Sequence, residues 1–190
     1  ENPVFPRADS LRPHTKCVQM VTTNENGMNL TIIDTPGLNE SAEADLSHML
    51  DLCRIIKQKG ICIIYRGNFI QGAINAVLYC FKLDSQKLVE SIEPSIRFYR
   101  DLFANCQETN FFGILTNVTM DEESIRKRNI NRLNVEKSAR DLASQLQSIL
   151  KLRYPPPIYV IDAWASKRND EYQIALENRK KIIEAISSAP

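Results

Sequence analysis

The sequence predicts an α/β fold, a doubly wound and mainly parallel sheet with helices on both faces. Short continuous apolar runs recur along the chain, at residues 30–33, 76–81, 111–115 and 158–161. Strands that are buried on both faces show such continuous runs, whereas half-exposed strands alternate apolar and polar residues. Helical patterns lie between the runs, and strands that alternate with helices are typical of a parallel sheet.

Four stretches carry the apolar spacing of amphipathic helices, at residues 43–57, 85–105, 124–152 and 170–187. Gly60 is expected to end the first helix, and Pro94 predicts either a kink or two shorter helices within the second. The third has an apolar stripe that predicts packing on the sheet, with a coiled coil as the alternative: Val135, Ala139, Leu142, Leu146 and Ile149. The last helix is expected to bury Ile174, Leu176, Ile182, Ile183 and Ile186.

Length and composition fit one domain with a sizeable core, because the chain has 190 residues of which 43% are hydrophobic. The formal net charge of +1 gives no electrostatic footprint for nucleic acid. The short basic groups at residues 126–128 and 179–181 are therefore expected to be solvated helix faces. No apolar run is long enough for a membrane span or a secretory signal, so membrane attachment would need a segment outside this chain.

The five cysteines are scattered and odd in number, which argues against a disulfide framework or a zinc site. Cys53 and Cys80 lie within apolar patterns, where a thiol behaves as a small hydrophobe and is expected to be buried. A reducing, cytoplasmic setting follows from this usage.

The segment Asp34-Thr35-Pro36-Gly37 directly follows the apolar run at residues 30–33. A carboxylate at the end of a buried strand can hold Mg²⁺ through water, and a glycine can bring its backbone N–H close to a terminal phosphate. The pattern therefore indicates a nucleotide site. The alternative is an ordinary turn, in which Pro36 sets φ and Gly37 closes the chain reversal.

Four stretches give the chain a family resemblance: residues 2–17, 30–38, 72–84 and 116–123. In this order they resemble the immune-associated GTPases (the GIMAP or avirulence-induced family) of the septin-like branch of the P-loop GTPases. They are also similar to the chloroplast import-receptor GTPases. Taken singly, only residues 34–38 are specific.

The resemblance implies one P-loop GTPase-like domain over residues 1–190, beginning at or after the end of the family's first helix. It implies GTP or GDP with Mg²⁺, with Thr15 and Asp34 at the metal, Gly37 bonded to the γ-phosphate, and Thr35 and Pro36 in the same nucleotide-binding segment. Leu38 stands where a catalytic Gln would follow, which implies weak hydrolysis. In the resembling families such a residue accompanies a homodimer formed through the nucleotide face.

The resemblance implies that the base is recognised by Thr116, Asn117, Thr119 and Asp121. It also implies that Ala163 and Trp164 of the next loop pack on the base. The family motif has an Asp where this chain has Thr119, so guanine selectivity rests on Thr119 or on a shifted Asp121. Alternatively, Asp121 belongs to the acidic first turn of a helix. A buried Trp at a sheet edge is the alternative for Trp164.

The family's phosphate-binding loop, G-x-x-x-x-G-K-[ST], and its first strand do not occur in the sequence. That strand belongs in the middle of the sheet, and its loss would leave buried backbone groups unpaired. We therefore expect an upstream segment to supply them. The competing interpretation is a degenerate, non-hydrolysing GTPase-fold interaction domain.

Overall fold

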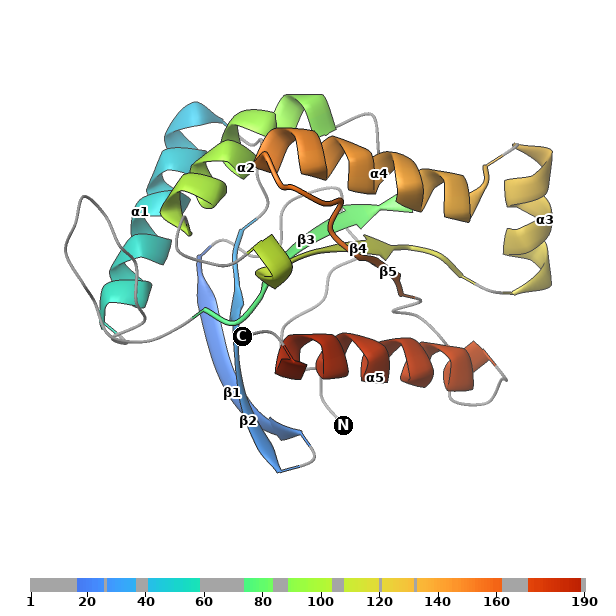
Figure 1. Cartoon of the computed structure of the whole chain (residues 1–190), viewed down its shortest axis with the longest axis horizontal. Helices are drawn as coiled ribbons and strands as arrows, with labels where there is room; N and C mark the ends of the chain where they lie inside the picture. Colours follow the sequence, from blue (N-terminus) through green and yellow to red (C-terminus); the bar gives the residue numbers. More distant parts are fainter. Residues whose placement is uncertain are drawn as a thin grey trace. The chain divides into compact units, whose positions relative to one another are not determined.

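The computed structural model describes residues 17–25, 27–36, 41–58, 74–83, 89–103, 108–119, 121–131, 133–161 and 171–188. They belong to two compact units, one within residues 1–72 and the other within residues 73–190. Figure 1 labels the helices and strands of both units in chain order. The predicted single domain over residues 1–190 stays a prediction.

The first unit contains an antiparallel hairpin of β1 (Gln19–Glu25) and β2 (Met28–Asp34). Glu25 pairs with Met28, so two residues connect the strands, and Gly27 takes a positive φ of 84°. Its N–H donates to the Asn24 side chain at 3.0 Å. The structure confirms a strand at residues 30–33, but this strand pairs antiparallel with β1 and its Ile32 is 44% exposed, so the prediction of burial on both faces was wrong for it. The sequence interpretation missed β1, although Asn-Gly is a strong hairpin signal.

The helix α1 (Ala42–Gln58) confirms the first predicted helix. It begins after Ser41, whose hydroxyl accepts the N–H of Ala44 at 3.1 Å and so satisfies one of the helix's unpaired first donors. Leu52 and Ile56, one turn apart, are buried, whereas Leu46 and Leu50 are exposed. The helix is therefore packed through the side that carries Leu52 and Ile56, whereas the leucines of its first half, which the amphipathic pattern placed on the apolar side, stay exposed.

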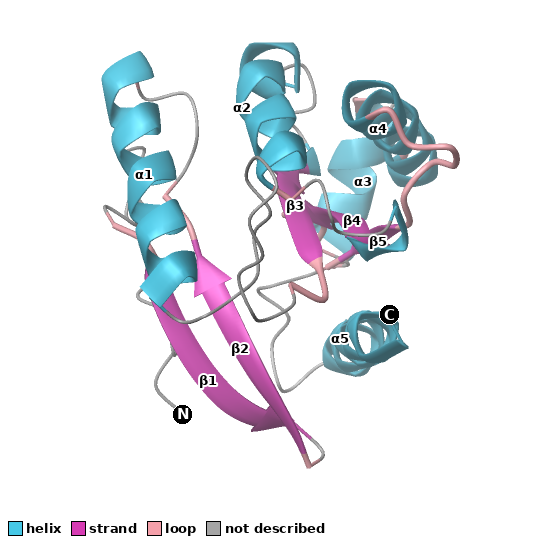
Figure 2. Cartoon of the chain, turned by 60° about the vertical axis from the view of Figure 1, so that its left-hand side comes forward, coloured by secondary structure: helices cyan, strands magenta, loops and turns pink. Residues whose placement is uncertain are grey.

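The second unit is built on a parallel sheet, drawn in magenta in Figure 2, with the order β3-β4-β5. Its strands are β3 (Val77–Lys82), β4 (Phe111–Thr116) and β5 (Ile158–Val160), at three of the predicted positions. Two further backbone bonds of 2.9 Å lengthen the pairing of β4 with β5, from Gly113 N–H to Pro157 O and from Ile161 N–H to Leu115 O.

The predicted burial on both faces holds for β4 and fails for β3. Every residue of β4 from Phe111 to Leu115 is buried. In β3, Tyr79 and Phe81 are buried, but Leu78 is 40% exposed and Cys80 is exposed, so the prediction of a buried Cys80 was wrong. Among the described residues β3 pairs with β4 alone, so it is an edge strand of this sheet with one uncovered face.

The described part of the second unit has four α-helices: α2 (Val89–Leu102), α3 (Glu122–Ile130), α4 (Val135–Leu150) and α5 (Glu171–Ser188). The helix α4 contacts α2, β4 and β5, and α5 contacts β5. Figure 1 shows α4 and α5 on opposite faces of β5, which is the doubly wound arrangement. The helix α2 continues through Pro94 as one helix.

The stretch predicted as one helix over residues 124–152 is divided into α3 and α4. The division lies at Asn134, whose side chain accepts the N–H of Lys137 at 2.8 Å and caps the start of α4. Packing on the sheet, predicted from the apolar stripe, is confirmed for Leu142, Leu146 and Ile149, which are buried.

The helix α5 buries less than its sequence pattern predicts. Ile182 is buried, but Ile174 is 45% exposed and Leu176 is 36% exposed. A single 18-residue helix that packs against one short strand cannot cover all its apolar residues at once. No helix in the described ranges is long and apolar enough to cross a bilayer.

The centre of the second unit is tightly packed around Leu146 and Gly113. Leu146 on α4 has 0% exposed surface. A Cβ placed on Gly113 of β4 would lie 2.3 Å from Ile158 Cδ1 and 3.3 Å from Leu146 Cδ1, so this position has no room for a side chain. The helix and β5 thus pack directly on the backbone of β4.

Leu146→Ala is expected to lower the free energy of unfolding by about 2–5 kcal/mol, because it removes buried methyl groups and leaves a cavity under α4. Urea denaturation followed by circular dichroism measures this change. Ser144→Ala is the matched control on the exposed side of the same helix and should change the value by less than about 0.5 kcal/mol. Equal effects of both variants would contradict the assigned core.

Candidate functional site

The first group of predicted site residues lies at the carboxyl end of β2. Asp34 is the last residue of that strand and pairs with Gln19 of β1. Thr35 is half-buried, and Pro36 is among the most completely buried residues of the described chain. The buried proline fixes the direction in which the chain leaves the strand. Thr15 and Gly37, predicted beside this group, lie outside the described residues.

The donor chemistry of this group suits a metal ion that is shared with a nucleotide. Within the described residues, no three His, Cys, Asp or Glu side chains gather closely enough to hold a metal ion by themselves. Mg²⁺ does not need such a cluster, because it keeps several waters and takes one or two carboxylates together with substrate phosphates. Asp34 offers one carboxylate at a strand end, which fits that role.

The second group lies at the carboxyl end of β4. Thr116 is the last residue of the strand, and its hydroxyl donates to the carbonyl oxygen of Phe81 at 3.2 Å. This bond ties together the ends of the two neighbouring parallel strands, where ligands bind in doubly wound folds.

The two residues after Thr116 have opposite surroundings. Asn117 takes a positive φ of 62° and is exposed, whereas Val118 has 0% exposed surface. Asn is one of the few residues that adopt the left-handed conformation readily. The buried Val118 anchors the segment in the core, and Asn117 is held at the surface of the loop.

Asp121 is the N-cap of α3, with extended backbone angles. Its Oδ1 accepts the N–H of Ser124 at 2.8 Å. Hydrogen bonds from the Ser124 hydroxyl, the Ser124 backbone and the Thr119 side chain lower the pKa of Asp121 below the usual range of an aspartate. The capping alternative that the sequence left open therefore has a direct structural basis.

Arg128 is a member of this group that sequence reasoning missed. Its Nη1 donates to the carbonyl oxygen of Thr119 at 2.6 Å. The sequence suggested only a solvated basic helix face, and for its neighbour Lys127, which pairs with Glu123 at 2.6 Å in the open, that expectation is correct. No spacing rule predicts a bond between an arginine and a distant loop carbonyl.

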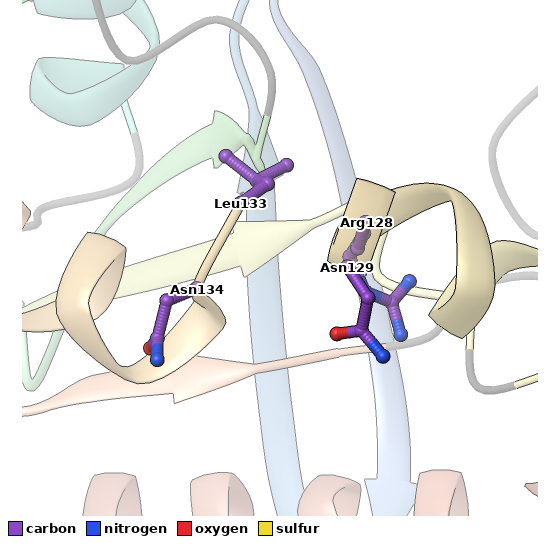
Figure 3. A pocket seen from close by; sticks show the side chains of 4 residues that line it. All are labelled: Arg128, Asn129, Leu133 and Asn134. Carbon is purple, nitrogen blue, oxygen red and sulfur yellow. The ribbon is translucent and has the colours of Figure 1, made fainter. Parts of the chain in front are cut away.

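An open hollow of about 280 Å³ lies beside this group. Figure 3 shows Arg128 and Asn129 of α3 on one side and Leu133 and Asn134, at the start of α4, on the other. Asn134 is already engaged as the cap of α4. The hollow thus marks where α3 turns into the next helix.

The structure brings together Thr116, Asn117, Thr119 and Asp121 at the end of β4. The segment Asp34-Thr35-Pro36 belongs to the other compact unit. Ala163 and Trp164, predicted to follow β5, lie outside the described residues, as do Gly60 and the insertion at residues 61–71.

Ser124→Ala is expected to raise the pKa of Asp121 toward its usual range, because the Ser124 hydroxyl is the largest cause of its depression. The depressed pKa contributes stability that is present above the ordinary aspartate pKa of about 3.9 and is lost as the pH falls through the lower folded value. An NMR titration of the Asp121 carboxyl carbon measures the shift. Ser144→Ala is the control, and equal titration curves for both variants would refute the assignment.

Comparison with known proteins gives a likeness in fold. No protein-family model matches the chain, and no curated protein matches it in sequence. A dimerization-deficient mutant of Toc33 from Arabidopsis thaliana matches with a TM-score of 0.61 and 17% identity, over 98% of this chain and 73% of that chain. A second match has a TM-score of 0.57 and 17% identity, over 97% and 74% of the two chains. It comes from work on the chloroplast translocon components atToc33 and psToc159, for which dimerization is important for GTPase activity. The likeness shows that this chain has a P-loop GTPase-like α/β fold.

Proposed function

We propose that this chain is a guanine-nucleotide-binding switch domain that takes GTP or GDP with Mg²⁺, hydrolyses GTP weakly and self-associates in a nucleotide-dependent way. The proposal rests on one observation: in a chain with a P-loop GTPase-like fold, the backbone leaves the carboxyl end of β2 through Asp34-Thr35-Pro36. From the motif residues, we also propose that the chain belongs to the GIMAP-like, septin-like branch of the P-loop GTPases.

On the phosphate side, Asp34 holds Mg²⁺ through a water, Thr15 completes the metal shell, and Gly37 donates its N–H to the γ-phosphate. The burial of Pro36 supports this assignment, since it fixes the direction in which the chain leaves Asp34. Loss of the γ-phosphate would release these contacts, which is how such a switch changes its surface.

On the base side, Asn117 and Thr119 face the guanine edge, while Ala163 and Trp164 pack on the ring. The burial of Val118 supports this part of the proposal, because it anchors the residues on either side, and a polar edge is read strongly only when its partners are in register. Asp121 acts first as the cap of α3, and its second carboxylate oxygen would supply any contact with the base.

Weak hydrolysis rests on Leu38, which offers no group to orient an attacking water. Self-association rests on the Toc33 structures, whose dimerization is described as important for GTPase activity. The odd number and scattered positions of the five cysteines support a reducing, cytoplasmic setting.

A degenerate interaction domain is the second candidate. The observation that favours it is the use of Asp121 as a helix cap, with Thr119 standing where the related motif has its base-reading carboxylate. The two candidates differ in one property, the Mg²⁺-dependent binding of GTP.

The deciding experiment measures binding of labelled GTP to the full-length protein, with and without Mg²⁺, and with ATP as competitor. Mg²⁺-dependent binding that GTP displaces and ATP does not would support the switch. A folded protein that binds neither nucleotide would refute it and favour the degenerate domain.

Asp34→Ala is expected to weaken Mg²⁺-dependent GTP binding by about 10- to 100-fold, the usual cost of losing an outer-shell metal partner. Its binding without Mg²⁺ should change little, since only the metal contact is removed. Glu43→Gln, in the first turn of α1, is the control and should bind as the wild type does. The same loss in the presence and absence of Mg²⁺ would count against a metal role.

Sedimentation velocity tests self-association. The full-length protein is expected to sediment as a monomer without nucleotide and as a dimer with a non-hydrolysable GTP analogue and Mg²⁺, because the two copies would meet across the nucleotide face. GDP gives the comparison state. Identical sedimentation in all three conditions would exclude a nucleotide-dependent dimer.

A further inference from the structure

We propose that Arg128 is a positioning residue for base recognition, which holds residues 117–119 in the conformation that presents Asn117 and Thr119 to the base. This inference rests on the proposed function above and names a residue for which that function gave no role. It is carried by the bond from Arg128 Nη1 to the Thr119 carbonyl oxygen, at 2.6 Å.

The loop needs such a support, because burial reaches only one of its residues. Val118 is fully enclosed, but Asn117 before it is exposed in a left-handed conformation, and Thr119 after it is half-buried. Asn117 adopts this conformation readily, but its exposed side chain gives the loop no packing support. The Thr119 carbonyl is the point where a charged donor reaches the loop from another element.

Packing does not hold α3 in place, since the helix has no buried side chain. A helix without an apolar contact face relies on caps and polar bonds for its position. Those bonds are the Asp121 cap at its start and the Arg128 bond to the loop near its end. One bond therefore acts at each end of α3, and the bond from Arg128 joins the far end of the helix to the loop that precedes it.

Arg128 also connects the loop to the rigid part of the unit. Its own carbonyl oxygen accepts the N–H of Leu133 at 2.9 Å, in the connection that leads into α4. That helix is anchored in the core by Leu142 and Leu146. Through its backbone carbonyl and its guanidinium, Arg128 thus links the connection into α4 with the exposed loop. A charged donor bonded to a carbonyl contributes more than a neutral one.

The test compares Arg128→Ala with Arg128→Lys and with the control Arg126→Ala, an exposed arginine on the same helix. Each full-length variant is measured for GTP affinity and for displacement of the same probe by inorganic triphosphate, which has no base. Arg128→Ala is expected to weaken GTP about tenfold and to leave triphosphate displacement unchanged. Arg128→Lys, which keeps a charged donor, should recover part of the loss, and Arg126→Ala should match the wild type.

A second measurement is made on the protein without nucleotide, so that it does not depend on binding. Hydrogen exchange of the backbone amides at residues 117–124 should speed up in Arg128→Ala and stay unchanged in Arg126→Ala. Equal weakening of GTP and triphosphate, or unchanged exchange, would overturn the positioning role.

If the wild type binds no GTP, the proposed function fails, and the inference fails with it. If the wild type binds and Arg128→Ala binds equally well, the inference alone fails. Should Arg128→Ala not fold, Arg128→Lys decides: a loss confined to GTP supports the role, and wild-type affinity refutes it.

Discussion

Burial of β4 between β3 and β5 is the constraint on which the second unit depends. Its residues from Phe111 to Leu115 are buried, so the backbone groups of the strand must pair with neighbouring strands and both faces must be covered. The helix α4 packs on one face over Gly113, where the absence of a side chain lets it approach. Where the strand ends at Thr116, the chain returns to solvent, and the polar residues gather there.

Two kinds of interaction therefore stabilise the second unit. Its centre is held by apolar packing that depends little on pH or salt, whereas α3 and the loop before it are held by a carboxylate cap and an arginine bond. Segments held by few buried contacts open at lower free-energy cost than the core. The loop after β4 is thus the part of this unit in which a bound ligand can alter local order without disturbing the sheet.

Much of the sheet and most of the helices were predictable, because continuous apolar runs and helical periodicity are local signals. The failures have physical causes. The sequence could not show that one face of β3 is left uncovered by the described residues, so Cys80 and Leu78 were expected inside. Nor could it show that the cap at Asn134 divides α3 from α4. In the site, Thr116 and Asn117 could be predicted because they stand where an apolar run ends. Arg128 could not, because it acts through a bond to a residue nine positions away that has no sequence signature.

The close approach at Gly113 has an evolutionary consequence. Because Ile158 Cδ1 fills the space where a Cβ would stand, the two positions share one volume across the β4–β5 pair. A larger residue at 113 is compatible with the sheet only if position 158 becomes smaller or turns its side chain away. In related chains these two positions should therefore vary together rather than independently, and their covariation would record the spacing of the two strands.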